Sequence, residues 1–215
     1  MIVDMHIHTI VSSPCSSIDP LECIETAISL GLDAVCITEH ETLEGARVIK
    51  ELAAGYSEIR VFEGIEVLSQ EGHLLVYGYS EDIKGVPSAR EVIEIVESAG
   101  GIVVPAHPWR KPFGWYTGGL DKPVEDTEFP RLFSVIEMYN GLQSQSQNQL
   151  GEDYCRNFGV RGIGGSDAHW MEGLGAVVTE FEEDIEDERH LVHLLRNGSY
   201  TARLTDRYYK NQQER

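Results

Sequence analysis

The sequence predicts an α/β fold with a mainly parallel sheet. Strand and helix patterns alternate about seven times along the chain, which is typical of this class. The strand expected at 33–38 is almost entirely apolar, as in a sheet that is covered on both faces. Helix-start signals stand between such strands, and one of them is Ser88 followed by Glu91, the pattern of a capping box.

Each element in the first half of the chain has a local reason. The first strand alternates apolar Met5 and Ile7 with polar neighbours. Asp19 and Pro20 begin a helix, because Asp caps the first turn and Pro needs no amide partner there, and Gly31 ends it. The elements expected in order are a strand at 2–9, a helix at 19–31, strand 33–38, helix 42–54, strands 59–68 and 72–79, helix 88–99 and strand 101–106.

The second half continues the alternation after one long interruption. The stretch from Trp109 to Pro130 is rich in Gly, Pro and aromatic residues and has no period, which predicts a long surface loop of the kind that often carries function. Residues 1–204 are expected to form a single domain and 205–215 a polar, frayed tail. The remaining elements are expected at strand 133–139, helix 144–158, strands 160–164 and 176–181, helix 187–196 and strand 199–204.

Composition excludes several classes of protein. The 215 residues suffice for one sizeable core, and 41% apolar with 25% charged residues is typical of a soluble protein. We expect no membrane span and no signal peptide. Four scattered cysteines without CxxC spacing suggest reduced thiols and a cytoplasmic location. A net charge of −19 argues against stable nucleic-acid binding, and the oligomeric state is left open.

Polar residues decide between a barrel and an open doubly wound sheet. They stand at or just past the carboxyl ends of the expected strands, and in a β/α barrel these ends converge on one face, where such folds place their active sites. An open sheet would spread them along a line too long for one site. We therefore expect a barrel with a polar site formed by His6, His8, Glu39, His40, Glu66, His107, Asp167 and His169.

The histidines indicate metal binding. Six of the eight lie at strand ends or starts, whereas His190 and His193 lie on a late helix without a carboxylate partner and are expected to be inert. Imidazole and carboxylate together suit Zn, Fe or Mn, and a shared carboxylate can bridge two ions. The set exceeds what one tetrahedral ion needs, so the sequence predicts at least two metals.

Four motifs resemble those of the PHP (polymerase and histidinol phosphatase) family: Asp4-Met5-His6-Ile7-His8-Thr9, Thr38-Glu39-His40, Ala106-His107-Pro108 and Ser166-Asp167-Ala168-His169. They span residues 2–169. The resemblance implies a distorted (β/α)7 TIM-like barrel with two or three metals and phosphoesterase activity. It implies a first metal on His6, His8, Glu66 and Asp167, a second on Glu66, His73 and His107, and a third on His40 and His169.

One departure from the family pattern concerns the third metal. Trinuclear members usually supply another His or acidic residue shortly after the first motif, where this chain has Ile10-Val11-Ser12-Ser13-Pro14-Cys15. Asp4 is expected to act indirectly, by orienting a ligand histidine.

The expected activity is hydrolysis of a phosphate ester, a small-molecule or nucleotide phosphomonoester, by a hydroxide that bridges two metals. Asp167 and His40 or His169 are the acid–base candidates. Arg110 is the candidate phosphate clamp, ahead of Arg203 and Arg207. Two alternatives remain: an amidohydrolase-like metal hydrolase, whose members often bridge metals with a carboxylated lysine, and a non-catalytic metal-binding scaffold.

Overall fold

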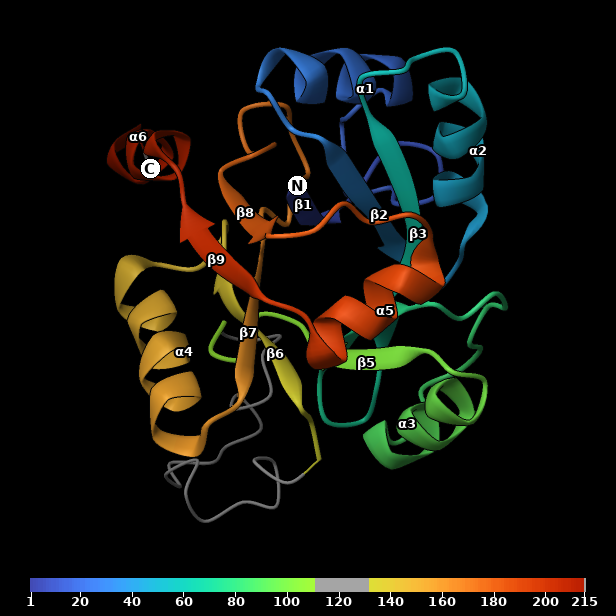
Figure 1. Cartoon of the computed structure of the whole chain (residues 1–215), viewed down its shortest axis with the longest axis vertical. Coiled ribbons are helices and arrows are strands. Elements are labelled where there is room, and N and C mark those ends of the chain that lie inside the picture. The colour runs from blue at the N-terminus through green and yellow to red at the C-terminus, as the bar shows by residue number, and fades with distance from the viewer. Residues whose placement is uncertain (111–131, 215) are drawn as a thin grey trace.

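The computed structural model describes residues 1–110 and 132–214 and confirms the alternation of strands and helices (Figure 1). The predicted loop lies outside the described residues from 111 onward. In the described ranges no helix is both long and apolar enough to cross a membrane. The elements are β1 (Ile2–Ile7), α1 (Pro20–Ser29), β2 (Ala34–His40), α2 (Glu44–Ala53), β3 (Arg60–Leu68), β4 (His73–Tyr77), α3 (Ala89–Ser98), β5 (Ile102–Pro105), β6 (Val135–Asn140), α4 (Gln145–Phe158), β7 (Arg161–Gly165), β8 (Val177–Phe181), α5 (Glu188–Asn197), β9 (Tyr200–Leu204) and α6 (Asp206–Glu214).

The strands form a curled sheet of seven and a separate pair. The large sheet has the order β5-β4-β3-β2-β1-β8-β9, and β6 pairs in parallel with β7. β1, β2 and β3 are parallel, whereas β4, β8 and β9 run antiparallel to their neighbours. A single bridge between Ile7 and Ala168 joins the end of β1 to the chain after β7. The described strands therefore do not close into the expected hydrogen-bonded (β/α)7 ring, because no ladder of strand pairing joins the described pair to the large sheet.

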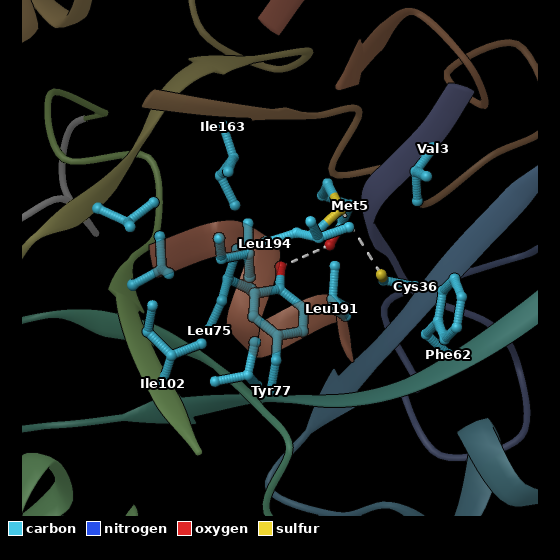
Figure 2. Close-up of a cluster of buried hydrophobic side chains, with 14 of the residues drawn as sticks. Val3, Met5, Cys36, Phe62, Leu75, Tyr77, Ile102, Ile163, Leu191 and Leu194 are labelled. Carbon is cyan, nitrogen blue, oxygen red and sulfur yellow. Dashed lines mark hydrogen bonds between the residues drawn. The ribbon is translucent and has the colours of Figure 1, made fainter. Parts of the chain in front are cut away.

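Helix α5 closes the sheet at the end opposite the histidines. Its Leu191 and Leu194 are buried among side chains of the sheet interior (Figure 2). In the same cluster Tyr77 donates a hydrogen bond of 2.7 Å from its hydroxyl to the carbonyl of Met5. The Arg196 guanidinium donates to the Gly101 carbonyl, just before β5, at 2.6 Å. This apolar packing leaves the carboxyl ends of the strands for polar side chains.

The other helices cover the outside of the sheet much as the sequence predicts. Asp19 accepts hydrogen bonds from the first turn of α1, and Ser88 forms the predicted capping box with Glu91. Ile24 of α1 and Ile49 of α2 are buried against the strands. Leu21, in the first turn of α1, is 44% exposed.

The prediction of a frayed tail after residue 204 is wrong. Residues Asp206–Glu214 form helix α6, and its Tyr208 is completely buried. The segment is polar nearly all round, so it shows no apolar stripe that would predict a helix. A single aromatic anchor and a set of hydrogen bonds to loop carbonyls hold it instead.

Candidate metal centre

The strand ends bring the predicted ligands into one cluster. His6 and His8 come from the end of β1, His40 ends β2, and Glu66 lies near the end of β3. β4 runs antiparallel, so its first residue, His73, lies at the same edge. The chain after β5 and β7 completes the cluster with His107, Asp167 and His169.

Glu66 lies at the centre of the cluster and is almost fully buried. Its Oε1 is 2.9 Å from Nδ1 of His73 and 2.9 Å from Nε2 of His107. Its Oε2 is 3.1 Å from Nδ1 of His40 and 3.2 Å from Nε2 of His8. Burial opposes ionisation, but the charge of His6 and the hydrogen bonds from His107 and His40 hold the pKa of Glu66 well below its usual range. One ionised carboxylate thus faces imidazoles on both sides.

The group formed by His6, His8 and Asp167 fits a metal ion. The two Nε2 atoms are 3.0 Å apart, and each lies 3.4 to 3.5 Å from Oδ1 of Asp167. Bonds of about 2.0–2.1 Å in a tetrahedral site put ligand atoms about 3.3 Å apart. Glu66 is at a similar distance, 3.2 Å from His8 and 3.6 Å from His6. Ring nitrogens and carboxylate oxygens therefore converge as the donors of a cation site do.

Two further groups of ligand atoms adjoin the first. Glu66, His73 and His107 form one, and His8, His40 and His169 form the other. Nε2 of His107 faces Glu66 at 2.9 Å, whereas its Nδ1 is buried and has no hydrogen-bond partner among the described residues.

The loop after the first motif supports His8 through hydrogen bonds of Ser13. Ser13 Oγ lies 3.3 Å from Nδ1 of His8 and donates to the buried carboxylate of Glu39. Glu39 accepts further hydrogen bonds from the backbone and hydroxyl of Thr9. Cys15 is exposed and belongs to none of the three ligand groups. A third metal would therefore rest on histidines alone.

Unusual backbone conformations mark the same centre. His107 and Asp167 have φ values of 30° and 52°, a region that non-glycine residues rarely adopt and that clusters at functional sites. The Asp167 amide donates to the His6 carbonyl at 2.7 Å, and the His107 amide donates to Oε2 of Glu137 at 2.5 Å. A Cβ atom at Gly165 would lie 2.4 Å from Cβ of His6, so this position has no room for a side chain.

Sequence reasoning missed Glu137 and Asn140. Oε1 of Glu137 lies 2.9 Å from Nδ1 of His6 and so orients this ring. Nδ2 of Asn140 donates to Glu137 at 3.0 Å and to Oδ2 of Asp167 at 3.3 Å. Both residues are completely buried, Glu137 within β6 and Asn140 at its last position. The only local signal was a carboxylate and an amide at the end of an apolar strand.

Asp4 accepts hydrogen bonds from backbone amides. Its oxygens accept hydrogen bonds from the backbone amides of Ser166 and Gly175 at 2.8 and 2.9 Å, and the His6 amide lies 3.3 Å away. Asp4 was expected to orient a ligand histidine; it contacts His6 through the backbone amide, whereas Glu137 contacts the ring. Burial raises the pKa of Asp4 to about 6, against the effect of these hydrogen bonds. Asp4 thus holds the loops that carry the ligands.

Arg110 and His169 lie next to Asp167. The Arg110 guanidinium contacts Oδ2 of Asp167 and is 27% exposed. Burial opposes ionisation of Asp167, but the charge of His6 and the hydrogen bond from His8, with the charge of Arg110, hold its pKa well below the usual range. Burial lowers the pKa of His169 to about 4, so this ring is neutral at pH 7.

The weaker candidates lie elsewhere. His190 and His193 are on α5, which closes the opposite end of the sheet. Arg203 pairs with Glu180 on the neighbouring strand, and Arg207 donates to the carbonyl of Met171. In the positions that the structure shows, none of these belongs to the three ligand groups or contacts them.

Comparison with known proteins places these features in a family. Residues 145–200 match a family model described as PHP-associated. The uncharacterized protein MJ1587 of Methanocaldococcus jannaschii is 30% identical over 149 residues, which cover 65% of this chain and 82% of the relative.

Three solved structures share the fold. PsfC from Pseudomonas syringae PB-5123 has a TM-score of 0.72 at 18% identity and covers 99% of this chain and 95% of its own. A two-domain protein from Bacteroides vulgatus, containing a predicted PHP-like metal-dependent phosphoesterase, has a TM-score of 0.71 at 18% identity, over 98% of this chain and 69% of its own. An amidohydrolase from Chromobacterium violaceum has a TM-score of 0.58 at 17% identity and covers 78% of this chain and 87% of its own.

The fold alone is common to phosphoesterase-like and amidohydrolase proteins, so it does not decide between them. The family model that matches residues 145–200 is described as PHP-associated, which agrees with the four motifs. The archaeal relative extends the match over most of its own length. Together with the four motifs, these findings show that the chain belongs to the PHP family.

Proposed function

We propose that the chain is a metal-dependent phosphoesterase. The observation that carries the proposal is the position of Glu66, whose two oxygens face different groups of imidazoles at 2.9 to 3.2 Å. A carboxylate in that position suits a bridge between two cations. Two-metal sites are typical of enzymes that cleave phosphate esters.

The proposed ligands follow the three groups. His6, His8, Glu66 and Asp167 would hold one ion, Glu66, His73 and His107 a second, and His40 and His169 a third. Zn, Fe and Mn suit such imidazole and carboxylate donors. When bound, the ions would lower the pKa of a water molecule and neutralise charge on the phosphate.

The protein's own groups would bind the substrate and move protons. Arg110 is the cation at the edge of the cluster and would contact a phosphate oxygen. Asp167 would accept a proton near the attacking water. His40, 30% exposed, or His169 would face the leaving oxygen and act on its proton. Arg110→Ala should therefore mainly raise KM and leave the metal content unchanged, as measured by steady-state kinetics and elemental analysis.

The substrate class is also part of the proposal. We propose a small-molecule or nucleotide phosphomonoester, because a net charge of −19 leaves local positive charge to the metals and Arg110 rather than to a nucleic-acid surface. The four free cysteines fit a reducing compartment, and we propose a cytoplasmic location.

An amidohydrolase-like activity is the alternative that one solved structure supports. In this site the central carboxylate belongs to Glu66 rather than to a carboxylated lysine, which favours the phosphoesterase. A non-catalytic scaffold would retain metals without turnover.

The deciding experiment is an assay of metal-reconstituted protein. A panel of phosphomonoesters, phosphodiesters and amides would be tested against Zn-, Fe- and Mn-loaded samples, with metal-free protein as the control. We expect metal-dependent turnover of a phosphomonoester. Turnover of amides alone, or full activity without transition metals, would contradict the proposal.

A further inference from the structure

A path of buried polar side chains runs from the C-terminal helix to the metal centre. It begins at Tyr208 of α6 and passes through Asn148 of α4 and Asn140 of β6 to Glu137 and His6. All five residues are at most 1% exposed. Polar groups in such surroundings have few alternative partners, so each one fixes the orientation of the next.

Asn148 links helix α6 to the end of β6. Its Nδ2 donates to the Tyr208 hydroxyl at 3.0 Å and to the Asn140 carbonyl at 3.1 Å, and its Oδ1 accepts from the Asn140 amide at 2.9 Å. The side chain of Asn148 thus binds both the backbone amide and the backbone carbonyl of Asn140. Its side-chain amide then contacts Glu137 at 3.0 Å and Asp167 at 3.3 Å.

Helix α6 also holds the loops that follow β6 and β7. The Tyr208 hydroxyl donates to the Gln143 carbonyl at 2.9 Å. Arg207 donates to the Met171 carbonyl at 2.6 Å, and Asn211 to the Glu172 carbonyl at 2.7 Å. Asn140 ends β6, and Asp167 follows β7. Helix α6 therefore contacts both of the loops that adjoin these two residues of the metal centre.

We infer that α6 is a positioning element of the metal centre, with Tyr208 acting through Asn148 and Asn140 on Glu137 and the ring of His6. The inference rests on the proposed metal binding. The ring of Tyr208 packs against Ala176 and Val177, whereas its hydroxyl accepts the hydrogen bond from Asn148 that begins the polar path. The packing role and the positioning role can therefore be separated by removing one oxygen.

The test is Tyr208→Phe in the full chain, with Tyr209→Phe, a 45% exposed neighbour on α6, as the matched control. Zinc affinity would be measured by competition with a chelator. We expect Tyr208→Phe to bind zinc about 5-fold more weakly, less than the roughly 10-fold to 100-fold seen when a direct partner of a ligand is removed. Tyr209→Phe should match the parent.

A second readout needs neither metal nor activity. In metal-free protein with ¹⁵N-labelled histidine, Tyr208→Phe should shift the ring signals of His6, while His190 and His193 on α5 serve as internal references. Shifts confined to the cluster support positioning. Equal shifts at His190 and His193, or none at His6, would show that the hydroxyl only stabilises the fold.

A double-mutant cycle with Asn140→Ala tests the route. If Tyr208 acts through Asn140, its hydroxyl should no longer affect zinc affinity in the Asn140→Ala background. A fully additive loss would overturn the inference. If the protein binds metal but hydrolyses no phosphate ester, the proposed function fails and this inference stands. If it binds no metal, the ring shifts of the metal-free protein still decide whether the path exists.

Discussion

Glu66 contacts more of the candidate ligands than any other side chain described above, and its charge is what two cations would share. Glu66→Gln keeps the size but removes that charge, so repulsion between two ions is less compensated and one should be lost. We expect about one ion fewer per chain and a fall in kcat/KM of about 10³-fold, or ~4 kcal/mol of transition-state stabilisation at ~1.4 kcal/mol per decade. Elemental analysis and kinetics on one preparation check this.

Glu63→Gln is the matched control for that change. Glu63 lies on the same strand but pairs with Lys50 away from the cluster, so its loss should leave metal content and turnover unchanged. Two tightly held ions with near-normal turnover in Glu66→Gln would show that Glu66 is not a bridge.

Glu137 supports a second prediction at the residue scale. Glu137→Gln keeps a carbonyl oxygen but removes the charge that holds the Nδ1 proton of His6. Metal affinity should fall by about 10-fold to 100-fold, as measured by chelator competition. Glu152→Gln on α4, which changes a carboxylate paired with Arg156, is the control. Unchanged affinity in Glu137→Gln would mean that His6 needs no partner to be oriented.

The sequence was most informative where a residue's role follows from its neighbours in the chain. His6 and His8 share a strand face, and His107 and Asp167 stand just after strands, so local pattern and family motif sufficed to select them. Glu137 and Asn140 escaped prediction because their role depends on how β6 and β7 lie against β1 and β5. No local pattern contains that information.

Among the elements, α5 shows why position in the fold matters more than residue type. His190 and His193 lie on the helix that packs into the sheet at the end opposite the ligands. Changing both to Ala should leave metal content and kcat/KM within a few-fold of the parent. An activity loss as large as that of His107→Ala would mean that a second site had been overlooked.

Leu194 on the same helix provides the contrasting change. It is 2% exposed within the interior cluster, so Leu194→Ala should lower the free energy of unfolding by about 2–5 kcal/mol. Leu52→Ala, at a 44% exposed position on α2, is the control. Urea unfolding of the three proteins measures the difference. A loss of no more than that of Leu52→Ala would contradict this packing.

Element prediction succeeded where a cap or an apolar stripe was present and failed where tertiary contacts supply the stability. The caps at Asp19 and Ser88 were confirmed. Helix α6 was missed because a polar segment with one buried tyrosine has no stripe. The described strands form a curled sheet and a separate pair and do not confirm a closed barrel, since alternation along the chain does not say which strands pair.

For the whole molecule, the metal-free cluster should make stability depend on pH in an unusual direction. Despite burial, which lowers them, neighbouring carboxylates raise the pKa values of His6, His8 and His73. Their stabilising effect is full below the unfolded value of about 6.5 and is lost as pH rises through the folded values. The lowered pKa values of Glu66 and Asp167 add stability that is lost only as pH falls below about 4.

His169 has the opposite effect on the pH dependence. Burial lowers its pKa in the folded protein to about 4, so its contribution to stability is lost as pH falls below the unfolded value of about 6.5. We expect the three histidines with raised pKa values to set the direction, so metal-free protein should be most stable between about pH 5 and 6.5 and weaken above that range. Metal binding needs deprotonated histidines, so its stabilisation should instead grow with pH, reaching about 3 kcal/mol when free metal exceeds Kd about 100-fold. Urea unfolding near pH 6 and pH 8.5, with and without zinc, would reveal opposite slopes. Parallel slopes would mean that the histidine cluster is not the metal site.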